Sequence, residues 1–135
     1  MKKCITDVDI IDTVKKVIRE SGVLKEVKGK LCEQYPKKAK EECVCVFCVS
    51  SLASQVESAY VVVNILVGDI YNDKTKQEEW DKARLRYLSP LFKNVLSSYS
   101  KDGWHIKLES QHIEQKEDLK AHIITNRLFV KYVNC

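Results

Sequence analysis

Between Cys45 and Ile70 the apolar positions recur at alternating spacings of four and three residues, the pattern of an a/d helical seam. The neighbouring positions are also apolar or small, and the charged e and g positions of a coiled coil are missing. The pattern therefore predicts a long helix that is covered on most of its sides. Because the run from Val61 to Val63 has strand propensity, a break near Tyr60 followed by a strand is the alternative. The seam consists of Cys45, Val49, Leu52, Val56, Ala59, Val63, Leu66 and Ile70.

Local signals predict two helices before this seam. The first begins after Thr6, which is placed as an N-cap with Asp9 in the position of a capping-box partner. Gly22 is placed as its C′ stop. A second, shorter helix is predicted from about Val23 to Gln34, and Pro36 closes it.

After the seam, residues 72–75 are predicted to form a loop, and a further helix follows from about Thr75. Pro90 either kinks this helix or starts another one. The period then changes, because apolar residues alternate with polar ones from Trp104 onward, which predicts a half-buried strand. A second strand is predicted at Arg127 to Val133. Glu117 to Thr125 is either a short helix or part of a hairpin that turns at Thr125-Asn126.

These elements predict a single α+β domain over residues 1–135 that is predominantly helical. Four or five helices would surround the long apolar helix over about residues 6–101. A small C-terminal antiparallel β hairpin or sheet would occupy about residues 103–134. The chain has 135 residues, of which 44% are hydrophobic and 31% are charged, and this composition is that of an ordinary globular protein.

Charge and polar content exclude several classes of protein. The net charge of +4 is nearly all dispersed lysine, with 19 Lys against four Arg, so nucleic-acid binding is disfavoured. The apolar stretch carries many serines and amides, so no membrane span is expected. The N-terminus has no apolar segment typical of a signal peptide. We therefore expect a protein that is not secreted and that resides in a reducing compartment, the cytoplasm or the nucleus.

Cysteines provide the main candidate chemistry. Cys43, Cys45 and Cys48 are crowded together, and Cys32 is the nearest further thiol. Thiolates bind zinc, so these four residues form an alternative metal site. A second complete pair of ligands is missing, however, and the favoured interpretation is buried free thiols that act as small apolar side chains, with no metal or other cofactor.

Residues 14–31 resemble the N-terminal dimerisation segment of LisH-related, FOP-type centrosomal proteins. The shared features are an amphipathic helix, the sequence Ser21-Gly22-Val23-Leu24, and a following lysine-bearing segment. The chain departs from that family after Pro36. The resemblance implies a dimer interface, and its candidate residues are Val17, Ile18, Val23, Leu24, Val27 and Leu31.

Functional motifs are absent from the sequence. There is no G-x-S-x-G, P-loop, H-E-x-x-H or dinucleotide fingerprint, so no catalytic residue is assigned. We expect a non-enzymatic intracellular module for protein–protein interaction or assembly. It is a candidate homodimer that self-associates through helical surfaces, and any other protein partner is unidentified. The alternative is a small metal- or thiol-dependent protein that uses Cys43, Cys45 and Cys48.

Overall fold

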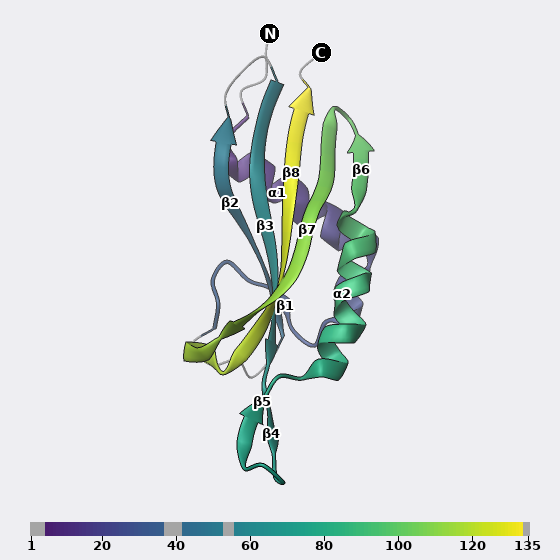
Figure 1. The fold of residues 1–135 in the computed structure, drawn as a ribbon. Coiled ribbons are helices and arrows are strands. Elements are labelled where there is room, and N and C mark those ends of the chain that lie inside the picture. The colour runs from purple at the N-terminus through teal and green to yellow at the C-terminus, as the bar shows by residue number, and fades with distance from the viewer. Residues whose placement is uncertain (1–4, 37–41, 53–55, 134–135) are drawn as a thin grey trace.

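The computed structural model describes residues 5–36, 42–52 and 56–133, and its main feature is a strongly curled six-stranded sheet (Figure 1). The strands lie in the order β1-β2-β3-β8-β7-β6, and all neighbours are antiparallel except the parallel pair β1 and β2. A separate ribbon of β4 and β5 projects beyond one end of the sheet. The strand bounds are β1 Lys30–Leu31, β2 Cys43–Leu52, β3 Val56–Gly68, β4 Ile70–Asn72, β5 Gln77–Glu79, β6 Ser98–Lys101, β7 Trp104–Lys116 and β8 Ala121–Val133.

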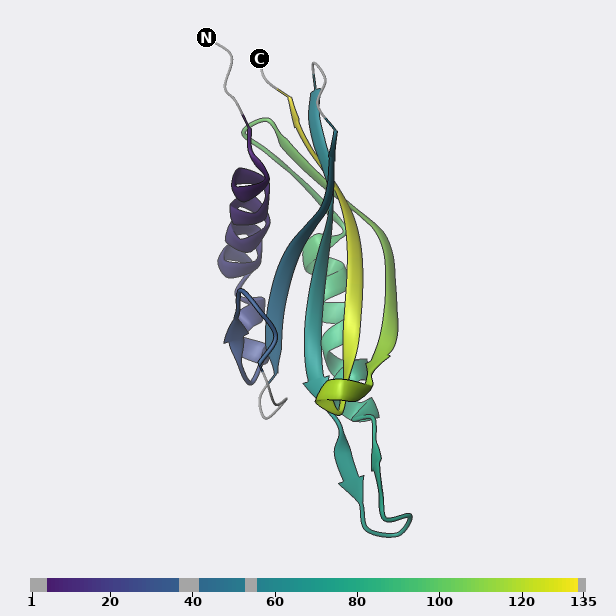
Figure 2. The same ribbon diagram turned by 90° about the vertical axis from the view of Figure 1, so that its left-hand side faces the viewer.

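Two helices, α1 (Asp7–Ser21) and α2 (Lys82–Leu96), lie on the same side of this sheet (Figure 2). Their apolar side chains meet the inward-facing strand positions and form the main core. No helix covers the opposite side of the sheet among the described residues, and we call that side the open face. The largest fully buried side chains of the main core are Ile18, Ile65, Leu85, Leu88, Phe92, Leu96, Ile124 and Leu128.

The N-terminal helix confirms its predicted boundaries. The Thr6 hydroxyl accepts a hydrogen bond from the backbone N–H of Asp9 at 3.2 Å, and the Asp9 carboxylate accepts one from the backbone N–H of Thr6 at 2.9 Å. This reciprocal pair satisfies two N–H groups that the helix start leaves open. Gly22 ends the helix with φ +80°, a left-handed conformation that a residue without a Cβ adopts freely.

The prediction of a long apolar helix over residues 45–70 is wrong, because the stretch forms β2 and β3, which pair antiparallel. Successive side chains of a strand point to opposite faces. Here Val44 packs in the main core, whereas Cys43 and Cys45 pack on the open face with Leu66. Since both faces are apolar, no period-two alternation is visible, and the spacing matched a heptad by coincidence.

The alternative of a break near Tyr60 followed by a strand is right only for the residues after Tyr60, because β3 runs without a break from Val56 and Cys43–Leu52 is already a strand. Residues 53–55 of the predicted helix lie outside the described residues. The high content of β-branched residues in this stretch, rather than the apolar spacing, was the informative signal.

The helix predicted from Val23 to Gln34 is also wrong. One 3₁₀ turn, η1 (Val23–Glu26), follows α1, and the chain then extends into β1. A Cβ built on Gly29 would lie 1.4 Å from the carbonyl oxygen of Glu42. The two backbone segments therefore approach so closely that only glycine fits at this position.

The helix expected from about Thr75 begins later. Thr75 lies in the turn between β4 and β5, and α2 follows the N-cap Asp81, whose carboxylate accepts a hydrogen bond from the backbone N–H of Arg84 at 3.2 Å. Pro90 lies inside α2 instead of starting a separate helix. No helix within the described ranges is both long enough and apolar enough to cross a membrane.

The C-terminal strands confirm the change of period after Gly103 and are longer than expected. β7 starts at Trp104 as predicted, and β8 runs without a break through Thr125-Asn126. The hairpin turns at η2 (Glu117–Leu119), where Lys120 takes up a left-handed conformation with φ +50°.

The predominantly helical fold with four or five helices is therefore wrong. The described residues contain two α-helices, two 3₁₀ turns and eight strands. The division into a helical part up to about residue 101 and a β-rich part from about 103 fails for the same reason, because β3 from the first part pairs with β8 from the second. One sheet joins strands from both halves of the chain.

A buried ion pair ties α2 to the start of β2. The Arg84 guanidinium donates to the Glu42 carboxylate through Nε and Nη2, both at 2.7 Å, and Nη2 also donates to the carbonyl oxygen of Glu26 at 2.8 Å. The backbone N–H of Lys28 donates to the same carboxylate at 2.9 Å. Burial tends to raise the pKa of Glu42, but these hydrogen bonds and the charge of Arg84 outweigh it and hold that pKa below its ordinary value.

Candidate interaction surface

The ribbon of β4 and β5, residues 70–79, projects from the packed body, and we call it the arm (Figures 1 and 2). Its strands place Tyr71 opposite Glu78, and its turn is held by Asn72, whose side-chain oxygen accepts from the backbone N–H of Lys74 at 2.9 Å. The two strands pair with each other and make no extensive contact with any other described element. Because an isolated two-stranded ribbon is only marginally stable in water, the order of the arm depends on its attachment.

The attachment consists of Asp69, Trp80 and His122, which we call the root. The ring N–H at Nδ1 of His122 donates to the Asp69 carboxylate at 2.7 Å, and both side chains are largely buried. The Trp80 ring lies 5.1 Å from the His122 ring, and the ammonium group of Lys82 lies 5.2 Å from the Trp80 ring. The backbone N–H of Asp69 also donates to the carbonyl oxygen of Lys120 at 2.9 Å. Both legs of the arm are thus fastened to the start of β8.

Large apolar side chains are exposed at this end of the molecule. The exposed fractions are 50% for Ile70, 56% for Tyr71, 40% for Trp80 and 39% for Ile113. The remaining exposed large apolar side chains among the described residues are scattered over other elements. Single exposed apolar residues are normal, but a group of them that includes aromatic side chains is typical of a binding surface.

A pocket of about 200 Å³ lies beside the root, between α2 and β7, and we call it the root pocket. Trp80, Leu85 and Ile113 form its apolar lining. Lys82 and Arg86 add two positive charges. The Glu78 carboxylate is exposed on the arm itself. The arm therefore places the Glu78 carboxylate next to the Tyr71 ring, and the root pocket places two cationic side chains next to apolar ones.

The cysteines do not gather at one point. Cys43 and Cys45 are buried side by side on the open face with their Sγ atoms 3.9 Å apart, and Cys32 packs against them. Cys48 packs against the main core on the other side of β2. The hydrogen bond to Cys45, together with burial, raises the pKa of the Cys43 thiol. Within the described ranges, no group of three or more His, Cys, Asp or Glu residues is arranged so that it could hold a metal ion.

The candidate interface residues lie in α1, in η1 and close to β1, and the structure places them in the main core. Val17, Ile18, Val23 and Val27 are buried, whereas Leu24 and Leu31 are half-buried against the same core. The dimer interface that the resemblance to LisH-related proteins implies stays a prediction, as does the resemblance itself.

Two further thiols of the sequence, Cys4 and Cys135, lie outside the described residues.

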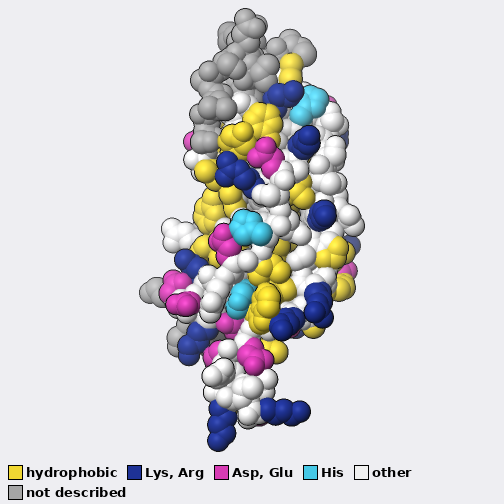
Figure 3. All heavy atoms as spheres, viewed as in Figure 1, with side chains coloured by type: hydrophobic (Ala, Val, Ile, Leu, Met, Phe, Trp, Pro, Cys, Tyr) yellow, Lys and Arg dark blue, Asp and Glu magenta, His cyan; other side chains and the backbone are white. Residues whose placement is uncertain are grey.

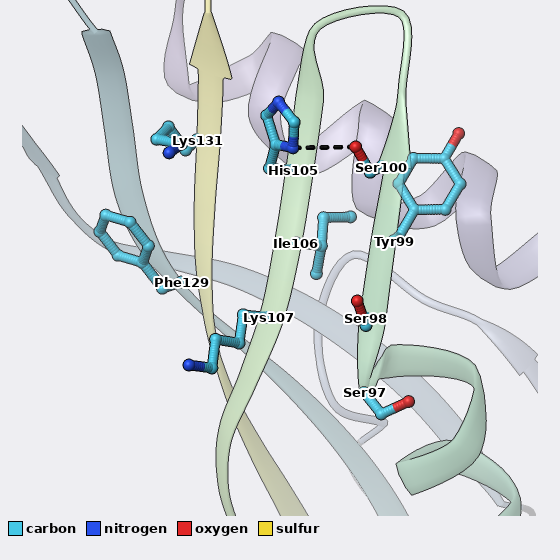
Figure 4. A pocket seen from close by; sticks show the side chains of 9 residues that line it. All are labelled: Ser97, Ser98, Tyr99, Ser100, His105, Ile106, Lys107, Phe129 and Lys131. Atoms are coloured by element: carbon cyan, nitrogen blue, oxygen red, sulfur yellow. Dashed lines mark hydrogen bonds between the residues drawn. The ribbon is translucent and has the colours of Figure 1, made fainter.

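The open face shows apolar side chains along its middle with basic groups spread among them (Figure 3). A shallow pocket of about 340 Å³ lies on this side near β6, β7 and β8 (Figure 4). The His105 ring turns toward the Ser100 hydroxyl, with Nδ1 and Oγ 2.9 Å apart, while the side chain of Lys107 extends away from them. Ser100 is exposed, so this pair is a surface hydrogen bond. The basic groups do not converge on it.

Comparison of the sequence with models of protein families and with curated proteins finds no match. The fold and the surface described above therefore carry the functional argument.

Sequence reasoning missed the arm. It assigned Ile70 to the apolar seam and Trp80 to the following helix. A partial signal was present, because Asn72 and Asp73 are turn-forming residues. The segment Gln77–Glu79, however, has no strand propensity in the sequence. That Tyr71 would remain exposed had no signal in the sequence.

Proposed function

We propose that the protein is a non-enzymatic assembly module that binds protein through the arm and the root pocket. The observation that carries this proposal is an ordered arm that holds Ile70 and Tyr71 in solvent, away from the core of its own chain. Burying a side chain of this size contributes about 1.5–3 kcal/mol relative to leaving it exposed. Burial of these side chains by a partner would therefore stabilise the complex, and tyrosine and tryptophan are frequent anchors of such contacts.

The proposal keeps the idea of self-association but moves it away from the helices. The apolar stripes of α1 and α2 are used inside the chain, where they form the main core. The arm and the root pocket are what the body leaves open. A metal- or thiol-dependent function has less support, because Cys48 lies across β2 from Cys43 and Cys45.

A reducing compartment, the cytoplasm or the nucleus, is part of the same proposal. Its support is the packing of Cys43 and Cys45, which fill a buried apolar cluster as small side chains.

Association as a function of concentration tests the proposal. We expect sedimentation velocity to show self-association of the purified chain at tens of micromolar. The Tyr71→Ser variant should raise the dissociation constant by about 10-fold or more, since truncating an anchor residue of an interface lowers the binding free energy by about 2 kcal/mol. The matched control is Val8→Ser, which removes an equally exposed apolar side chain from α1 and should leave association unchanged.

Circular dichroism must show that both variants keep the fold. A protein that is strictly monomeric over this concentration range would overturn the proposal. Association that Tyr71→Ser leaves unchanged would also overturn it.

A further inference from the structure

We infer that the occupant of the root pocket is the arm of a second copy of this chain, and that two copies exchange arms reciprocally about a two-fold axis. The inference rests on the proposed function and names its partner. In this dimer Tyr71 of each copy covers the apolar lining of the other copy's root pocket. Glu78 of each copy meets Lys82 and Arg86 of the other.

The arm does not reach the root pocket of its own chain. Its two strands pair throughout, with Ile70 opposite Glu79 and Asn72 opposite Gln77. The root fixes the direction in which the arm leaves the sheet, and both views show it extending past the start of β8 (Figures 1 and 2). Folding back onto α2 would break this pairing or the root, so an arm can reach a root pocket only in a second molecule.

Charge and apolar character match between one face of the arm and the root pocket. Tyr71 and Glu78 are cross-strand partners, so they lie on the same face of the arm. The root pocket has the complementary pair of properties, an apolar floor that includes Ile113 and a basic side formed by Lys82 and Arg86. One arm face can therefore place its aromatic ring on the floor and its carboxylate against a cation at the same time.

The positions of the two surfaces favour a two-fold axis. The pocket lies directly beside the root of the arm, because Trp80 belongs to both. When two copies lie with their arms side by side and antiparallel, each arm passes the root of the other. A contact from arm to pocket then implies a second contact from pocket to arm, which is the self-complementarity of an isologous interface. Two contacts form together, and the interface closes as a dimer.

Charge reversal on each surface tests the exchange. Glu78→Arg places like charges in both contacts of its own dimer, and the double variant Lys82→Glu/Arg86→Glu, which reverses both cations of the pocket, does the same with the opposite sign. We expect each variant alone to raise the dissociation constant by at least about 10-fold. An equimolar mixture of the two should associate as well as the wild type, because in the mixed dimer the reversed arm meets the reversed pocket and the natural arm meets the natural pocket. The matched controls are Lys93→Glu on α2 and Asp12→Arg on α1, both at exposed positions, which should associate like the wild type.

Sedimentation velocity of each variant and of the mixture provides the readout. Recovery in the mixture, at the mass of a dimer, supports the exchange. Variants that lose association without recovery in the mixture would overturn the reciprocal exchange and leave the proposed function standing. Recovery at masses above a dimer would also overturn it, in favour of a head-to-tail assembly. Variants that associate like the wild type would overturn the exchange, and the Tyr71→Ser result then decides the proposed function separately.

Discussion

At the scale of the residue, Glu42 shows how one buried charge connects distant segments. Its side chain is 5% exposed, and it accepts hydrogen bonds from Arg84 on α2 and from the backbone of Lys28. Removing one partner of a buried ion pair leaves the other charge uncompensated, and this lowers the stability by more than the intact pair contributes to it. The pair therefore acts mainly as a constraint on how η1, β2 and α2 meet.

We expect Arg84→Met to lower the free energy of unfolding by about 1.5–3 kcal/mol at neutral pH, the range for a hydrogen bond to a charged group, because the Arg84 side chain is 20% exposed. The wild-type pair should also show a pH dependence. Because the folded-state pKa of Glu42 lies below its ordinary value of 4.5, its contribution is complete above that value and is lost as the pH falls through the lower folded pKa. Urea denaturation at several pH values measures both effects. Lys93→Met, an exposed change on the same helix, is the control, and an Arg84→Met protein as stable as this control would contradict the prediction.

At the scale of the element, the arm exists because the sheet ends before the chain turns back. The last pair between β3 and β8 joins Gly68 to Ala121, and beyond it the chain has only its own return strand as a partner. The Asp69–His122 hydrogen bond and the ring of Trp80 then fix the direction of the ribbon. The arm is rigid at its root and held elsewhere mainly by its own ladder.

Replacing both Asp69 and His122 by Ala should release the arm without unfolding the body. A typical hydrogen bond contributes about 0.5–1.5 kcal/mol, and one to a charged group more, so we expect amide hydrogens of residues 70–79 to exchange several-fold faster. Hydrogen exchange read by mass spectrometry measures this. The double variant of His112→Ala and Glu114→Ala removes a similar but exposed pair on β7, joined at 2.6 Å, and is the control. Unchanged exchange in the arm would show that the root does not hold it.

At the scale of the whole molecule, two apolar clusters share one sheet. The main core lies between the helices and the sheet, and a smaller cluster on the open face contains Cys43, Cys45, Leu66, Ala121 and Ile123. The segment after β1 reaches this smaller cluster, where Tyr35 packs edge-on to Phe47 at 5.7 Å between ring centres. Both clusters draw on β2, β3 and β8, so they should be lost together.

Thiol labelling checks this expectation. Cys43 and Cys45 are buried, and their mutual hydrogen bond raises the pKa of Cys43 and lowers that of Cys45. Because burial keeps the reagent from both sulfur atoms, we expect both to react slowly with an alkylating reagent in the native state. Their labelling should rise at the same urea concentration as the loss of the circular dichroism signal. The half-buried Cys32 is the internal comparison and should react first. Labelling of Cys45 well before the main transition would show that the open-face cluster unfolds separately.

The parts that the sequence predicted correctly are those whose signals are local. Thr6, Asp9 and Gly22 define α1 within its own residues, and the alternation from Trp104 onward marks a strand with one polar face. The stretch from Cys43 to Gly68 failed because both of its faces are apolar, which makes a buried strand and a buried helix look alike. The close backbone contact at Gly29 had no local signal, because the neighbouring residue, Glu42, is distant in sequence.

Local sequence is enough to define the capped first helix, the change of period after Gly103 and the turn residues Asn72 and Asp73, because each depends on neighbours along the chain. Long-range packing is needed to show that the apolar seam is two strands, that the candidate interface residues from Val17 to Leu31 pack in or against the core, and that Tyr71 is exposed. Strand pairing joins residues far apart in sequence, and what remains exposed depends on where that pairing stops.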